Sequence, residues 1–77
     1  MDIFNVVLSE AAEKDLKKIP KHVVLSLQAW VDDVGEIGLS QVRKIKGYHD
    51  EPLKGKRFGQ RSIRLNKAYR AIYKESR

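Results

Sequence analysis

The hydrophobic positions of the chain change their spacing from one segment to the next. Residues 3–8 (IFNVVL) are rich in β-branched and aromatic side chains, which predicts a strand. Apolar residues then recur at helical spacing, which predicts a first helix that begins after an N-cap at Ser9 and ends before Pro20. The same spacing predicts a second helix over residues 21–34, with Trp30 on its buried stripe. We expect the two helices to form an antiparallel hairpin that packs on a sheet.

The second half of the chain has the pattern of a β-hairpin. Ser40 is expected to cap a short helical turn, and the Gly and Pro residues of segment 46–59 predict a loop. Residues 60–65 (QRSIRL) and 69–74 (YRAIYK) alternate apolar and polar side chains and predict two paired strands, although Ile72 falls on the polar face. The order strand, helix, helix, strand, strand predicts one α+β domain over residues 1–77.

Charge separates the two halves of the sequence. Residues 1–40 carry four lysines and seven acidic residues, whereas residues 41–77 carry twelve Lys or Arg residues and three acidic residues. Because the positive charges lie on a predicted hairpin that would hold them in place, we favour a polyanion-binding face over an ordinary solvated surface. The absence of cysteine and of any long apolar run, together with an acidic residue at position 2, predicts a cytoplasmic protein.

The predicted hairpin brings arginines together. If Ile63 faces the helices, Arg64 and Arg70 share the opposite face, close enough to repel each other unless an anion lies between them. This arrangement favours an RNA or DNA phosphate, and Tyr48, Phe58 and Tyr69 offer faces on which bases could stack, although core packing is the preferred interpretation of Tyr69. Four further basic residues are expected to line the approach to this site: Lys54, Lys56, Arg57 and Arg61.

Three residues before this basic segment could take part in acid–base chemistry. Glu51, beside a ribose 2′-hydroxyl, could accept its proton while Arg70 stabilises charge on the attacked phosphate. Asp50 could act as the base instead of Glu51. Glu51 differs from it in that the following Pro52 holds the Glu51 backbone in an extended conformation. The alternative for Glu51 is a surface carboxylate paired with Lys54. His49 is an acid–base candidate by residue type, and the favoured alternative is a loop histidine that bonds to the neighbouring acids. No spacing of ligands or glycines predicts a metal site or a cofactor.

The segment "EPLKGKRFGQRSIRLNKAYRAIY", after a strand and a helical hairpin, resembles the RelE/ParE superfamily of bacterial type II toxins, and in particular its RelE, YoeB and HigB branches. The resemblance implies a small toxin that cleaves mRNA in the ribosomal A site without a metal or cofactor. The RNA's own 2′-hydroxyl would attack and leave a cyclic phosphate. The implied partners are the ribosome, its mRNA and a cognate antitoxin protein.

Carried over by position, the resemblance makes Glu51 the general base and Arg70 the arginine that stabilises the transition state. Arg64 falls on a phosphate-contacting position, whereas Ser62 replaces a basic residue of RelE. HigB-like members have a histidine at the Glu51 position, and here His49 comes two residues earlier.

The family pattern continues through one more strand with further catalytic side chains, which the 77 residues do not include. The resemblance therefore implies a free sheet edge that an antitoxin segment or a second copy could cover. Two alternatives remain beside the nuclease: a ParE-like inhibitor of DNA gyrase, and a catalytically inactive toxin that still binds its antitoxin.

Overall fold

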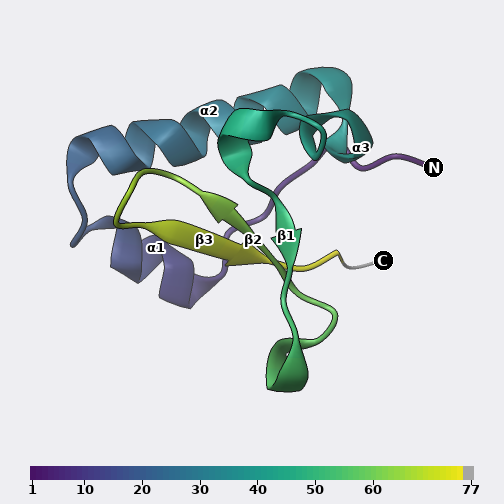
Figure 1. Ribbon diagram of the computed structural model, residues 1–77. Helices are drawn as coiled ribbons and strands as arrows, with labels where there is room; N and C mark the ends of the chain where they lie inside the picture. Colours follow the sequence, from purple (N-terminus) through teal and green to yellow (C-terminus); the bar gives the residue numbers. More distant parts are fainter. Residues whose placement is uncertain (76–77) are drawn as a thin grey trace.

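The computed structural model describes residues 1–75 (Figure 1). It combines helices with one antiparallel sheet, which confirms the predicted α+β class. The helices are α1 (Glu10–Leu16), α2 (Lys21–Ile37) and α3 (Leu39–Val42), and the strands are β1 (Glu51–Pro52), β2 (Arg61–Arg64) and β3 (Arg70–Tyr73). Two short 3₁₀ turns flank β1, namely η1 (Lys46–Tyr48) and η2 (Gly55–Arg57). Among residues 1–75, no helix has the length and apolar character needed to cross a bilayer.

The segment of residues 3–8 is not a strand, so this prediction is wrong. Its backbone partner is a helix: the Ile3 carbonyl accepts a hydrogen bond from the Leu39 amide at 2.8 Å. The Asp2 carboxylate accepts bonds from the amide and the hydroxyl of Ser40, at 3.0 and 2.7 Å. Ser40 therefore binds the N-terminal segment instead of capping α3, which begins after Gly38. The hydroxyl of Ser40 is the main reason that the pKa of Asp2 lies below its usual value.

The two main helices begin where the sequence predicts, although α1 already ends at Leu16. The Ser9 side chain accepts a bond from the Ala12 amide at 3.1 Å, which confirms the predicted N-cap of α1. Helix α2 is three residues longer than expected because it continues through Gly35 and ends only at Gly38, whose φ of 86° is open mainly to glycine. The chain reverses direction between α1 and α2 (Figure 1), but α1 buries none of its residues fully.

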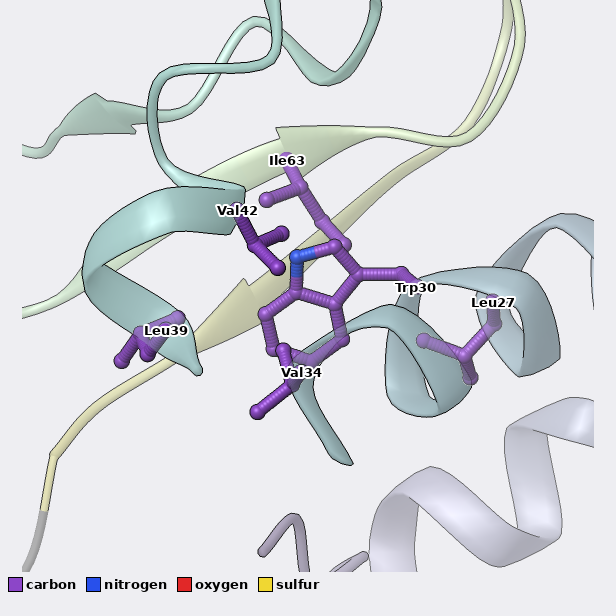
Figure 2. Packing of buried hydrophobic residues seen from close by; sticks show 6 residues of the cluster. All are labelled: Leu27, Trp30, Val34, Leu39, Val42 and Ile63. Atoms are coloured by element: carbon purple, nitrogen blue, oxygen red, sulfur yellow. The ribbon is translucent and has the colours of Figure 1, made fainter. Parts of the chain in front are cut away.

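The core lies between α2, α3 and the middle strand of the sheet (Figure 2). Its buried members are Leu27, Trp30, Val34, Leu39, Val42 and Ile63. Trp30 is only 3% exposed, which confirms its predicted place in the core. Its ring lies 5.0 Å from the ring of Tyr73, so β3 is held against α2 by an aromatic contact. The Trp30 indole nitrogen has no hydrogen-bond partner within residues 1–75, so this residue stabilises the fold by packing.

The sheet has the order β1-β2-β3, with both pairs antiparallel. The β2–β3 hairpin agrees with the prediction, and the side chain of Asn66 closes its turn by accepting bonds from the amides of Ala68 and Tyr69, at 2.8 and 2.9 Å. This turn fixes a register in which Arg64 lies opposite Arg70. Strand β1 falls inside the segment predicted as a loop. It is only two residues long and contains a proline, so no alternation marks it in the sequence.

Candidate functional site

The register of the three strands divides their side chains between two faces. Residues paired across antiparallel strands point to the same face, and neighbours along a strand alternate. One face, here called the inner face, carries Ile63 and packs on the helices; it also holds Pro52, Arg61, Ala71 and Tyr73. The other, the outer face, carries Glu51, Ser62, Arg64, Arg70 and Ile72. Ile72, whose place among polar residues the sequence left unexplained, is half exposed on this face.

Arg64 and Arg70 are direct cross-strand partners at one end of the outer face. Two like charges in such a pair destabilise a sheet unless an anion or an acceptor compensates them. Arg70 donates from Nε and Nη2 to the hydroxyl of Ser62, at 3.2 and 3.0 Å, and from Nη2 to the His49 carbonyl at 3.0 Å. Within residues 1–75, no carboxylate forms an ion pair with either arginine. Arg70 is therefore held by neutral acceptors, and together with Arg64 it forms a positive site that a phosphate would complement.

Glu51 lies on the same outer face, paired with Ser62, whose partner on β3 is Ile72, so β2 separates the strand of Glu51 from that of Arg70. The Arg70 guanidinium reaches across β2 to Ser62 and to the His49 carbonyl. Its side chain is exposed, and in the described part of the chain it forms no ion pair, including with Lys54. His49 comes two residues earlier, with a left-handed backbone (φ 46°) that turns the chain into β1. The structure thus places Glu51, Arg64 and Arg70 on one face, and the His49 carbonyl bonds to Arg70. The sequence predicted this shared face for Arg64 and Arg70 only.

The remaining predicted RNA-binding residues separate into two groups. Lys54, Lys56 and Arg57 are all exposed in the loop that joins β1 to β2, and this loop with η2 projects from the body of the molecule (Figure 1). Phe58, in the same loop, is 88% exposed and so presents a free aromatic ring. An extended polyanion crossing the outer face would meet this loop beyond Glu51.

Arg61 belongs to a different network on the inner face. Its Nε donates to the Asp50 carboxylate at 2.6 Å, and the Tyr73 hydroxyl donates to the same carboxylate at 2.5 Å. The Asp50 side chain is 0% exposed, whereas that of Arg61 is 27% exposed. Asp50 is thus enclosed and cannot replace Glu51 as the base, which corrects that expectation. Arg61 lies on the opposite face from Arg64 and Arg70, so we leave it out of the RNA-binding surface. Side chains alternate between the two faces along β2, so the inward position of Ile63 already indicated that Arg61 points to the inner face.

The same network continues to α3. The Nε of Arg43, the residue that follows α3, donates to the Tyr73 hydroxyl at 3.3 Å, and its guanidinium pairs with Glu75. Burial and the hydrogen bond to Asp50 raise the pKa of Tyr73, although Arg43 opposes them. Asp50, the residue before Glu51, is therefore bound to β2 and β3 through its side chain. The sequence does not reveal this role because it depends on burial.

We expect Asp50→Asn to lower the free energy of unfolding by roughly 2–3 kcal/mol. The amide removes the charge that the Arg61 guanidinium and the Tyr73 hydroxyl require, and partial exposure of Arg61 keeps the loss below that of a fully buried pair. Urea unfolding followed by tryptophan fluorescence measures the change. Asp15→Asn, at an exposed position of α1, is the matched control. Equal unfolding midpoints for Asp50→Asn and the parent would show that this ion pair contributes nothing.

A shallow depression of about 310 Å³ lies where η1 meets the end of β2. It is lined by Asp33, Ile45, Gly47, Tyr48, Arg64 and Leu65. The Tyr48 hydroxyl donates to the Asp33 carboxylate at 2.5 Å, so this ring is anchored to α2 instead of lying free for base stacking. Burial, together with the bond to Asp33 and its negative charge, raises the pKa of Tyr48 to about 12.

This raised pKa predicts a loss of stability at alkaline pH. Below the ordinary tyrosine pKa of 10.0, both the folded and the unfolded protein keep the Tyr48 proton, and the stabilisation is fully present. As the pH rises to about 12, the unfolded chain ionises first, and the free energy of unfolding falls. We expect this contribution to be about 1–2 kcal/mol after solvent screening.

The measurement is the free energy of unfolding of the parent and of Tyr48→Phe between pH 9 and 12 (roughly the range set by the two pKa values). The difference between the two proteins should shrink as the pH rises. Tyr69→Phe is the control, since its hydroxyl forms no hydrogen bond to other residues in the range 1–75. A difference that stays constant over this range would mean that the Asp33 bond does not perturb Tyr48.

In the described residues, no group of three or more His, Asp or Glu side chains could hold a metal ion. No protein-family model matches this chain, and neither the curated proteins nor the solved structures include one that is significantly similar to it. The resemblance to RelE-like toxins therefore rests on the quoted sequence segment and stays a prediction.

Proposed function

We propose that this protein is a ribosome-dependent mRNA endonuclease of the RelE-like toxin type. The observation that carries the proposal is the register of the sheet, in which Glu51, Arg64 and Arg70 share one exposed face while the inner face packs on the helices. One exposed carboxylate on the same face as two arginines that have no carboxylate partner in the described chain is a suitable arrangement for attack on a phosphodiester by the neighbouring 2′-hydroxyl.

In the proposed reaction, Glu51 takes the proton of the ribose 2′-hydroxyl as its oxygen bonds to phosphorus. Arg70 and Arg64 stabilise the added negative charge on the phosphoryl oxygens. The bond from phosphorus to the 5′-oxygen breaks, giving a 2′,3′-cyclic phosphate and a 5′-hydroxyl. His49 is our candidate for protonating the departing 5′-oxygen. The reaction requires neither an oxidant nor a metal ion.

The loop between β1 and β2 supports an extended RNA substrate. Lys54, Lys56 and Arg57 are exposed there, and each can contact a backbone phosphate without reading the base. We propose that this loop holds the mRNA on one side of the cleaved bond while Arg64 holds the other. The proposed protein partners are the ribosome, which presents the mRNA, and an antitoxin that blocks the outer face.

The test is to induce the chain in bacteria and map the 5′ ends of translated messages. The proposal requires new ends within the ribosomal A site and 5′-hydroxyl termini on the downstream fragments. Growth arrest with intact messages and inhibited DNA supercoiling would favour the gyrase inhibitor instead. Absence of both effects, with retained binding of an antitoxin, would indicate the inactive toxin.

A further inference from the structure

Ser62 stands out among the polar residues of the described chain because it is buried, at 5% exposure. It lies at the centre of the outer face, in the middle strand, paired on one side with Glu51 and on the other with Ile72. Its hydroxyl oxygen accepts two bonds from one guanidinium, that of Arg70. The Ser62 hydroxyl therefore has a fixed position, because the strands on both sides hold the Ser62 backbone.

The three hydrogen bonds of Arg70 leave a defined part of its guanidinium free. Nε and Nη2 donate to Ser62, and Nη2 also donates to the His49 carbonyl. An arginine side chain carries five N–H groups. The three bonds therefore use the Nε–Nη2 edge, and the two N–H groups of Nη1 have no partner within residues 1–75. Nη1 is thus the end of Arg70 that can reach a phosphate.

The partners of Arg70 also preserve its charge. Arg61 and Arg43 are paired with the carboxylates of Asp50 and Glu75. Within the described chain, Arg70 is held only by a hydroxyl and a carbonyl, which fix its orientation without neutralising it. Arg64 lies directly opposite and would push a free guanidinium away. Two neutral acceptors therefore hold the Arg70 guanidinium on the outer face, and no carboxylate of the described chain compensates its positive charge.

We propose that Ser62 is a positioning residue, which holds Arg70 on its Nε–Nη2 edge so that Nη1 points to the scissile phosphate. This inference rests on the proposed nuclease function. Ser62 itself touches no reacting atom. It acts by keeping Arg70 oriented before substrate binds, so that no ordering of the guanidinium is required during the reaction.

The first experiment observes Arg70 in the free protein and needs no nuclease activity. In ¹H–¹⁵N spectra, the Nε–H signal of Arg70, assigned by its loss in Arg70→Lys, should be ordered and slow to exchange in the parent. Ser62→Ala should make it mobile and fast to exchange, whereas Ser62→Thr, which keeps the hydroxyl, should restore it. Ser26→Ala removes a serine hydroxyl from α2, where it bonds to the His22 carbonyl, and should leave the Arg70 signal unchanged.

The second experiment measures single-turnover cleavage on programmed ribosomes. Ser62→Ala should lower the cleavage rate constant by about 10- to 100-fold with nearly unchanged ribosome affinity, because a small misplacement of a catalytic group has effects of this size. Ser62→Thr should recover most of the rate. If Ser62→Ala does not fold, Ser62→Cys keeps the volume but offers only a weak acceptor, and the same two measurements apply.

The outcomes separate this inference from the proposed function. An Arg70 Nε–H signal that is equally ordered in Ser62→Ala and in the parent would show that the Ser62 hydroxyl does not orient Arg70, whatever the cleavage rate. A mobile Arg70 with a parental cleavage rate would refute the positioning role. If the parent cleaves no RNA while Ser62→Ala still releases Arg70, the nuclease function is refuted, and the structural hold of Ser62 on Arg70 is supported.

Discussion

Glu51→Gln is expected to slow single-turnover cleavage of mRNA on programmed ribosomes by about 10²–10⁴-fold, the usual contribution of a general base. The amide has nearly the same shape as the carboxylate but cannot accept the 2′-hydroxyl proton. Arg70→Ala should slow the same step by about 10²–10³-fold, since it removes one donor that stabilises the developing phosphoryl charge. Both side chains are exposed on the outer face, so neither change should disturb the core.

Ribosome binding is the companion measurement, and it should change little in both variants because the basic loop between β1 and β2 remains. Glu36→Gln, an exposed acid of α2, is the matched control and should cleave at the parental rate. A parental rate for Glu51→Gln together with a slow His49→Ala would identify His49 as the base. If none of these changes matters and the chain still arrests growth, the nuclease proposal fails and the gyrase inhibitor takes its place.

Trp30→Ala is expected to lower the free energy of unfolding by about 3–5 kcal/mol, as for other large aromatic residues removed from a core. Trp30 is almost fully buried, and its ring joins α2 to β3 through Tyr73. A domain of this length buries a small core, so a loss of this size is a large part of its total stability. At the growth temperature, a substantial fraction of Trp30→Ala should be unfolded.

Thermal and urea unfolding followed by circular dichroism measure this effect without depending on the tryptophan signal. Trp30→Phe keeps a ring beside Tyr73 and removes an indole N–H that has no partner in residues 1–75, so it should cost clearly less. Phe58→Ala, at an exposed aromatic of the basic loop, should melt like the parent. A Trp30→Ala protein with parental stability would contradict the packing in Figure 2.

The sequence by itself determined the features that depend on local chemistry. Ser9 marks where the helical hydrogen bonding of α1 begins, because its side-chain acceptor acts within one turn of the chain. The alternation around Ile63 set the face of each residue in the β2–β3 hairpin. Asn66 closes its turn locally, so the sequence alone predicts Arg64 and Arg70 as outward neighbours.

Only the tertiary structure decided the features that depend on distant partners. Residues 3–8 have the composition of a strand, yet the N-terminal segment bonds to α3, 38 residues away in the case of Asp2 and Ser40. Asp50 and Glu51 are adjacent acids, and from the sequence either could be the general base. Burial distinguishes them, because the Asp50 side chain is enclosed with Arg61 and Tyr73 whereas Glu51 is exposed. The hold of Ser62 on Arg70 likewise requires two strands in register. Local sequence sets which conformations a segment favours, but long-range pairing and exclusion of water choose its partners.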